Sequence, residues 1–142
     1  MNLNKMIKEL SKALIEQILE EFPHLQTLNL SNNGKPPTIT PLLLEIERLD
    51  NLEHFVYLQH LDLSNNLLGS LSGVSQLLAL RELRVSHNQI SSLDGMQTLV
   101  NLSVFDVSHN RVGDLREVVR LKQNSQVREV WFEGNPIAAN KT

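Results

Sequence analysis

Two short segments of this chain place a serine, a histidine and an asparagine in succession. They are Ser86-His87-Asn88 and Ser108-His109-Asn110, which lie 22 residues apart. A serine hydroxyl activated by an imidazole is the nucleophile of many acyl-transfer enzymes, and two histidines are half of a tetrahedral zinc site. The segments therefore suggest two chemical hypotheses, a duplicated hydrolytic site and a metal site.

The hydrolytic hypothesis is disfavoured by geometry. A catalytic serine and histidine need hydrogen-bond contact, an orienting acid and an oxyanion hole. Adjacent side chains of an extended strand point to opposite sides, so Ser86 and His87 are poorly placed for each other. Serine also recurs without histidine at the equivalent positions Ser31 and Ser64. We therefore expect no catalytic residues, and we expect that the protein is not an enzyme.

The metal hypothesis lacks ligands. His87 and His109 occupy equivalent positions and are expected to stack, but a zinc site takes at least three protein ligands. The flanking members of this column are Asn65 and Gly134, and the nearby carboxylates follow no standard spacing. The chain also has no cysteine and no glycine-rich phosphate-binding loop. We therefore expect no metal and no cofactor, and a surface contact as the role of the histidine pair.

Composition favours a soluble protein of the cytoplasm. The chain has 142 residues, of which 41% are apolar and 20% charged, as in a globular domain. Its formal net charge of −3 disfavours nucleic acid as a partner. Charged residues interrupt the first 22 residues, so we expect neither a signal peptide nor membrane insertion. The missing cysteine agrees with a reducing, intracellular compartment.

Both segments belong to a longer repeat. Copies of the pattern L-x-x-L-x-L-x-x-N-x-L, with Val, Ile or Phe at some leucine positions, begin at Leu25, Leu58, Leu80, Leu102 and Val127. Positions four and six are apolar and alternate with polar positions, as a half-buried strand requires. After the asparagine, apolar residues recur every three positions, which indicates 3₁₀ turns or a short helix. Self-similarity of this kind is typical of a solenoid.

The asparagine column is expected to be structural. A buried amide at the end of each strand can bond the backbone groups that the turn leaves unpaired, and stacking makes these residues a ladder. The ladder consists of Asn33, Asn66, Asn88, Asn110 and Asn135.

This pattern resembles the leucine-rich repeat, over nearly everything from Leu25 to Ile137. The 22-residue period and short return legs are similar to the intracellular class typified by a protein phosphatase 1 regulatory subunit. The resemblance implies an α/β solenoid with a curved parallel β-sheet on its concave face and 3₁₀ or short helices on its convex face. It implies a non-enzymatic protein-binding scaffold, such as part of a cytoskeletal, ciliary or centrosomal protein. A regulatory subunit of an enzyme such as a protein phosphatase and a ribonucleoprotein assembly factor are the alternatives within the same class.

We expect a single domain over residues 1–142, with a capping region at 1–24 and about five repeats at 25–142. Apolar residues spaced three or four apart predict an amphipathic helix over residues 4–21, which ends before Pro23 and covers the first repeat. No C-terminal capping motif follows Asn135 and Pro136, so we expect the last core layer to need another cover.

The first repeat carries an insertion. Leu25 and Leu58 are 33 residues apart, whereas the next two steps are 22 residues each. Three-residue steps of apolar residues from Ile46 to Phe55 place the extra residues near 34–45. Thr40-Pro41 favours the start of a short helix, whose leucines at 42–44 either pack on the flank of the array or form an apolar patch.

The concave face is the expected binding site, because positions three, five and seven of each repeat point away from the core. Asp62, Arg84 and Asp106 alternate in sign, which favours cross-strand pairs. Trp131 is either an interface anchor or folded against Glu129, Arg84 or a cap. The face is acidic on balance, which favours a basic or mixed-charge protein partner. The candidate residues are His60, Asp62, Glu82, Arg84, Asp106, Glu129, Trp131 and Glu133.

Overall fold

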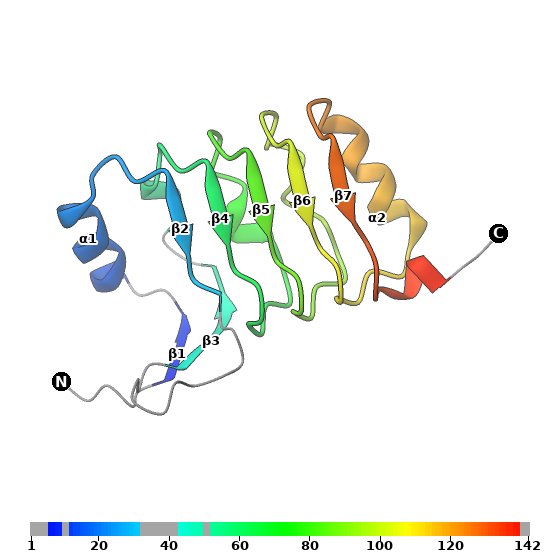
Figure 1. Ribbon diagram of the computed structural model, residues 1–142, viewed down its shortest axis with the longest axis horizontal. Coiled ribbons are helices and arrows are strands. Elements are labelled where there is room, and N and C mark those ends of the chain that lie inside the picture. Colours follow the sequence, from blue (N-terminus) through cyan, green and yellow to red (C-terminus); the bar gives the residue numbers. More distant parts are fainter. Residues whose placement is uncertain (1–5, 10–11, 32–42, 50–51, 140–142) are drawn as a thin grey trace.

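A computed structural model describes residues 6–9, 12–31, 43–49 and 52–139. Five short parallel strands lie side by side in chain order and form one sheet (Figure 1). The strands are β2 (Thr27–Asn29), β4 (His60–Asp62), β5 (Glu82–Arg84), β6 (Val104–Asp106) and β7 (Glu129–Trp131). Each strand pairs with the next at the same position of the repeat, so that Leu61 lies beside Leu83 and Leu83 beside Phe105. The alignment of the five repeats is therefore confirmed.

The core lies on one side of this sheet, because positions four and six point inward. Leu61, Leu63, Leu83 and Val85 are each at most 1% exposed. The return legs contain short helical elements, as the three-residue spacing predicts. They are η1 (Leu52–His54), η2 (Ser72–Val74), α2 (Leu115–Val119), η3 (Arg120–Gln123) and η4 (Pro136–Ala139). Elements η1 and η2 bury their apolar residues Leu52 and Val74. The predicted α/β solenoid is confirmed.

Close packing between return legs depends on one glycine. A Cβ atom at Gly73 in η2 would collide with the backbone carbonyl of Leu49 in the preceding coil. Because a carbonyl group cannot move aside as a flexible side chain can, only glycine allows this approach of the two coils.

The N-terminal helix is shorter than the sequence predicts. Helix α1 covers Lys12–Glu21, and residues Met6–Glu9 form strand β1, so the first part of the expected helix at 4–21 is wrong. Strand β1 pairs in parallel with β3 (Leu43–Arg48) in a separate two-stranded sheet. Pairing between segments far apart in the sequence overrides the local helical spacing. The remaining helix packs as expected, since Ile15 is fully buried in the core.

Strand β3 also corrects the account of the insertion. Leu43 and Leu44 lie in a strand, so the expected helix through the leucines at 42–44 is wrong there, and Ile46 belongs to β3 and not to the return leg. The proposed helix start at Thr40-Pro41 falls outside the described residues. Leu52 and Phe55 are buried as the three-residue spacing predicts.

The two ends of the solenoid carry the two α-helices of the described chain. Figure 1 shows α1 beside β2 and α2 beside β7, at opposite ends of the row of strands. Val130 and Phe132 of the last coil are only partly buried and pack against the core.

Within the described residues, no helix has the length and apolar character that crossing a membrane requires.

Candidate protein-binding face

The sheet register gathers the candidate residues into two neighbouring columns. His60 pairs with Glu82 at position three of the repeat, and this column ends at Glu129. Asp62, Arg84, Asp106 and Trp131 follow one another at position five across four adjacent strands. Glu133 follows β7 and is exposed. The structure therefore places the predicted concave residues on one continuous surface.

Arg84 lies at the centre of this surface. Its guanidinium donates to Glu82 Oε1 at 3.1 Å and lies 3.8 Å from Asp106 Oδ2 on the neighbouring strand. The same guanidinium lies 5.0 Å from the ring centroid of Trp131, which is the range of a cation–π contact. The expected cross-strand charge pairing is confirmed for Arg84 and Asp106, and Trp131 packs against Arg84 while it stays partly exposed.

Glu82 joins the network to its other neighbour. Its Oε2 atom lies 3.7 Å from Nδ1 of His60, while its Oε1 atom accepts from Arg84. Both the Glu82 and Arg84 side chains are about one-third exposed, at 30% and 34%. Ion pairs at this exposure contribute little to stability, so their effect here is to fix the directions of the side chains.

The aspartates of column five are oriented by the serines that follow them. Asp106 Oδ1 accepts from the backbone N–H of Ser108 at 3.0 Å and from its hydroxyl at 2.7 Å. Asp62 Oδ1 accepts from the N–H of Ser64 at 3.0 Å. Ser64 and Ser108 are buried, so these hydroxyls are structural and do not form an open polar stripe. These bonds to Oδ1 hold each carboxylate in one orientation, so that its Oδ2 atom points in a fixed direction.

The asparagine ladder is confirmed at every described position. The amide of Asn88 donates to Val85 O at 2.9 Å and to Leu63 O in the preceding coil at 3.1 Å, and its Oδ1 accepts from Leu68 N at 2.9 Å. Asn110 repeats this arrangement one coil later. Asn66 and Asn135 make the corresponding amide bonds, and Asn33 lies outside the described residues.

Family comparisons agree with this geometry. A model described as leucine-rich repeats in two copies matches residues 58–97 and 78–122, and a single leucine-rich repeat matches residues 24–49. The chain is built of leucine-rich repeats. No curated protein sequence matches it significantly.

Solved structures share the leucine-rich-repeat fold. Internalin C2 of Listeria monocytogenes is 25% identical with a TM-score of 0.63, over 80% of this chain and 54% of that one. This chain thus spans about half the length of the internalin structure. A chain in the structure of the Drosophila melanogaster SNF/U2A′ complex is 20% identical to this chain with a TM-score of 0.68. The match covers 94% of this chain and 74% of the chain in the complex. At 20% identity, this second likeness concerns the fold alone.

The two histidines of these leucine-rich repeats stack as predicted. The ring centroids of His87 and His109 are 4.3 Å apart, with an angle of 19° between the planes. Among the described residues there is no group of three or more side chains able to hold a metal ion.

Sequence reasoning missed why histidine stands at this position. His87 and His109 have φ angles of 56° and 55°, Asn65 has 61° and Gly134 has 77°. Position eight of the repeat therefore takes the left-handed conformation, which Asn, Gly and to a lesser degree His tolerate. The sequence signal for this conformation was the set of residue types at position eight of successive repeats, which are Asn, His, His and Gly. A Cβ atom at Gly134 would also collide with the ring of His109.

Sequence reasoning also missed a buried asparagine that lies outside the ladder. Asn124 is 3% exposed, and its amide donates to Met96 O at 2.8 Å and Leu99 O at 3.0 Å. It occupies the position that Leu77 and Leu99 fill with apolar side chains in the preceding coils. Its Oδ1 atom is buried without a hydrogen-bond partner in the described structure. An amide at a position that is otherwise apolar was the signal that the repeat alignment offered.

Proposed function

We propose that this chain is a non-enzymatic module that binds another protein through its concave sheet. Leucine-rich-repeat solenoids create extended concave surfaces that serve this purpose. The observation that carries the proposal is the contact of Arg84 with the ring of Trp131, at 5.0 Å, which links the central strand β5 to the last strand β7 of the sheet. Arginine and tryptophan are enriched among the few residues that carry most of the binding energy of a protein interface.

Pre-organisation supports the choice of this surface. Arg84 is held by Glu82 and Asp106, and Asp106 is in turn oriented by Ser108. Side chains that are already ordered lose less conformational entropy when a partner binds. A partner that contacts Trp131 therefore meets a surface that needs little rearrangement.

Charge indicates the class of partner. The cation of Arg84 is offset by Glu82 and Asp106. Asp62, Glu129 and Glu133 add further negative charge to the same face. Complementary charge steers association and selects partners, so we propose a partner surface that is basic or of mixed charge.

The experiment is affinity capture from the source cell with variants of the concave face. Trp131→Ala, Arg84→Glu and Asp106→Arg are each expected to weaken capture of the specific partner by about tenfold or more, as for central interface residues. Lys122→Glu is the control, because Lys122 is an exposed residue of η3 on the return leg. Full retention of the partner by all three concave variants, with normal circular dichroism, rejects the concave site.

The finer forms of this proposal concern the setting in which the protein acts. We place it in the cytoplasm, in a cytoskeletal, ciliary or centrosomal scaffold, from the sequence resemblance to the 22-residue intracellular class. The same class supports a regulatory subunit of a protein phosphatase. Co-purification of phosphatase activity with the captured partner distinguishes that role from a passive scaffold.

Ribonucleoprotein assembly is the second candidate, because the fold is similar to that in the SNF/U2A′ complex. It predicts an association that ribonuclease or raised salt releases, since phosphate contacts are strongly salt-dependent. Capture that is unchanged by ribonuclease excludes this candidate. The formal net charge of −3 favours the protein partner over nucleic acid.

A further inference from the structure

A second continuous surface lies where the return legs turn into the strands. Each of these five turns is closed by a backbone hydrogen bond from its fourth residue to its first. We call this surface the turn edge. The bonds are Leu25 N to Phe22 O at 3.3 Å, Leu58 N to Phe55 O at 3.2 Å, Leu80 N to Leu77 O at 3.1 Å, Leu102 N to Leu99 O at 3.2 Å and Val127 N to Asn124 O at 3.1 Å.

The second residue of three successive turns is an exposed aliphatic residue. Val56, Leu78 and Val100 are 63%, 58% and 53% exposed, and they recur every 22 residues. The last turn has Ser125 at the same position, so the turn itself accepts a polar residue there. Three aliphatic side chains in register thus form an exposed apolar stripe that the fold does not require.

The coils that carry the apolar stripe are held in direct contact. Arg81 N donates to Gln59 O at 2.8 Å and Ser103 N to Arg81 O at 2.8 Å. Within the turns, the side-chain amide of Asn101 donates to Leu78 O at 3.2 Å. Neighbouring strands of a sheet lie about 5 Å apart, so the aliphatic side chains form one surface.

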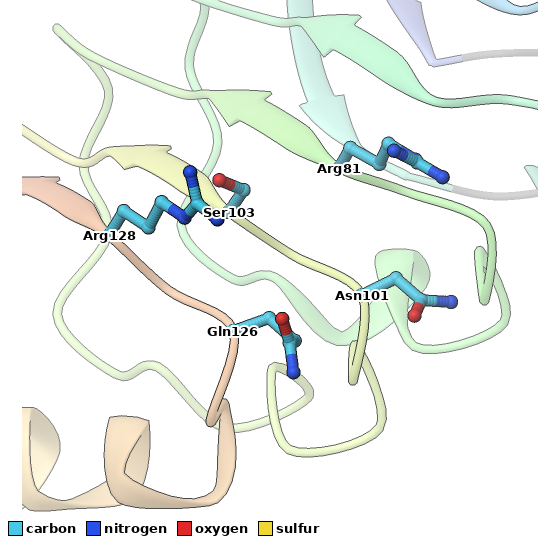
Figure 2. A pocket seen from close by; sticks show the side chains of 5 residues that line it. All are labelled: Arg81, Asn101, Ser103, Gln126 and Arg128. Carbon is cyan, nitrogen blue, oxygen red and sulfur yellow. The ribbon is translucent and has the colours of Figure 1, made fainter.

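Two arginines lie beside the apolar stripe. Arg81, Asn101, Ser103, Gln126 and Arg128 line a hollow of about 320 Å³, which we call the arginine hollow (Figure 2). Figure 2 shows that these side chains come from three successive coils. The two arginines stand on either side of the coil that contributes Ser103.

The cations of the arginine hollow are available to a ligand. Arg81 and Arg128 are both exposed, and within residues 52–139 neither makes an ion pair. Glu82, which follows Arg81, is already engaged by Arg84 and His60. A guanidinium presents several N–H donors in a plane that matches the two oxygens of a carboxylate. The hollow therefore has the donors, the charge and the room for an acidic side chain.

We propose that the turn edge binds an extended segment of a partner protein. One aspartate or glutamate of that segment enters the arginine hollow, and neighbouring apolar side chains of the segment lie along Val56, Leu78 and Val100. The charge of the hollow selects the carboxylate, and burial of the apolar stripe supplies hydrophobic free energy. The stripe is aliphatic, whereas single-stranded nucleic acid is bound by stacking on aromatic side chains. The exposed aromatic residues of the turn edge, Phe22 and Tyr57, belong to its first two turns and do not line the arginine hollow. The proposal adds a second protein-binding surface and does not depend on the concave site.

The test is selection from a phage-displayed library of random short peptides on the wild-type protein, with counter-selection on the double variant Arg81→Ala/Arg128→Ala. Selected peptides are expected to combine an acidic residue with at least two apolar residues. Their dissociation constants, measured by fluorescence anisotropy, should rise about tenfold or more with the double variant and with Leu78→Ser/Val100→Ser.

The controls separate the turn edge from other surfaces. Arg111→Ala and Leu115→Ser remove an exposed arginine and an exposed aliphatic residue elsewhere, and both should leave peptide affinity unchanged. Trp131→Ala should also leave it unchanged, and loss of binding with that variant would assign the peptides to the concave face and overturn the proposal.

Two further outcomes also overturn the proposal. One is a selection that yields no peptide, or only peptides without an acidic residue. The other is a selected peptide that binds at least tenfold more tightly when phosphoserine replaces its acidic residue, because the arginine hollow would then recognise phosphate in preference to a carboxylate. Every substituted residue is exposed except Trp131, which is partly exposed, so the circular dichroism spectrum of each variant is compared with that of the wild type before its affinity is interpreted.

Discussion

Alanine substitution of Asn88 and Asn110, singly and together, tests how the asparagine ladder stabilises the solenoid. Asn88→Ala leaves the buried N–H of Leu68 without the acceptor that it has at 2.9 Å. The carbonyl of Val85 keeps one partner, because it also accepts from Asn110 at 2.9 Å. One unsatisfied buried group and two lost hydrogen bonds predict a decrease of about 2–6 kcal/mol in the free energy of unfolding. Asn110→Ala should cost a similar amount, since Ile90 N loses its acceptor.

The double substitution should cost more than the sum of the two. Asn88 and Asn110 are the two side chains that donate to Val85 O within the described structure. Removing both leaves that carbonyl buried and unpaired, which predicts a coupling of about 1–3 kcal/mol. The control pair is Asn88→Ala with Asn135→Ala, because these side chains donate to different carbonyls. That pair should be additive to within about 0.5 kcal/mol.

The assay is urea unfolding followed by circular dichroism, with sucrose added equally to all samples to keep the weakest variants folded. Native-state hydrogen exchange at the amides of Leu68 and Ile90 reports each site separately. Additive costs of Asn88→Ala and Asn110→Ala in the double variant, as in the control pair, refute the reasoning. Such a result would mean that Val85 O finds another donor, such as water, when both amides are gone.

Gly73→Ala should destabilise the protein by about 1–3 kcal/mol or more, because the new Cβ atom meets the carbonyl of Leu49 and must displace backbone; an unchanged Tm in thermal unfolding contradicts this. His109→Val should cost about 1–2 kcal/mol, because residue 109 has a φ of 55°, whereas His109→Asn should be nearly neutral. Equal Tm values for these two variants would argue against a backbone constraint. Hydrogen bonds from the side chain and then the backbone of Arg116 hold the pKa of Asp114 below its ordinary value of 3.8. A lowered pKa in the folded state means that this contribution to stability is complete above the unfolded pKa and is lost as pH falls through the folded pKa. An NMR titration of the Asp114 carboxyl should therefore have its midpoint below 3.8, and Arg116→Ala should raise it.

Periodicity in the sequence was sufficient to predict the solenoid. A constant spacing of 22 residues places Leu61, Leu83 and Phe105 at equivalent positions, and the sheet pairs them. Alternation within each strand then decides which side chains point away from the core, so the residues of the concave columns could be predicted from the repeat alignment. The ladder was predictable for the same reason, because Asn88 and Asn110 end equivalent strands.

Features that depend on non-local contacts could not be read from spacing. The pairing of Met6 with Leu43 joins two segments with no shared periodicity, and the first of them has helical spacing. The choice of Arg84 between several carboxylates depends on side-chain directions, which a repeat pattern does not specify. The left-handed backbone at His87 is a different case, because it follows from residue types that were present in the sequence.

The ladder also gives the solenoid a direction. The backbone N–H groups of Leu68, Ile90 and Val112 donate to the Oδ1 atoms of asparagines 20, 20 and 23 residues further along the chain. Each coil therefore completes its hydrogen bonds only after the next coil has formed. During synthesis on the ribosome, the last coil of the growing solenoid has one backbone N–H without its asparagine acceptor until about one more repeat has emerged. Folding of such a chain advances from its N-terminus in steps of a repeat, and a ribosome that stalls within a repeat leaves the preceding coil unfinished.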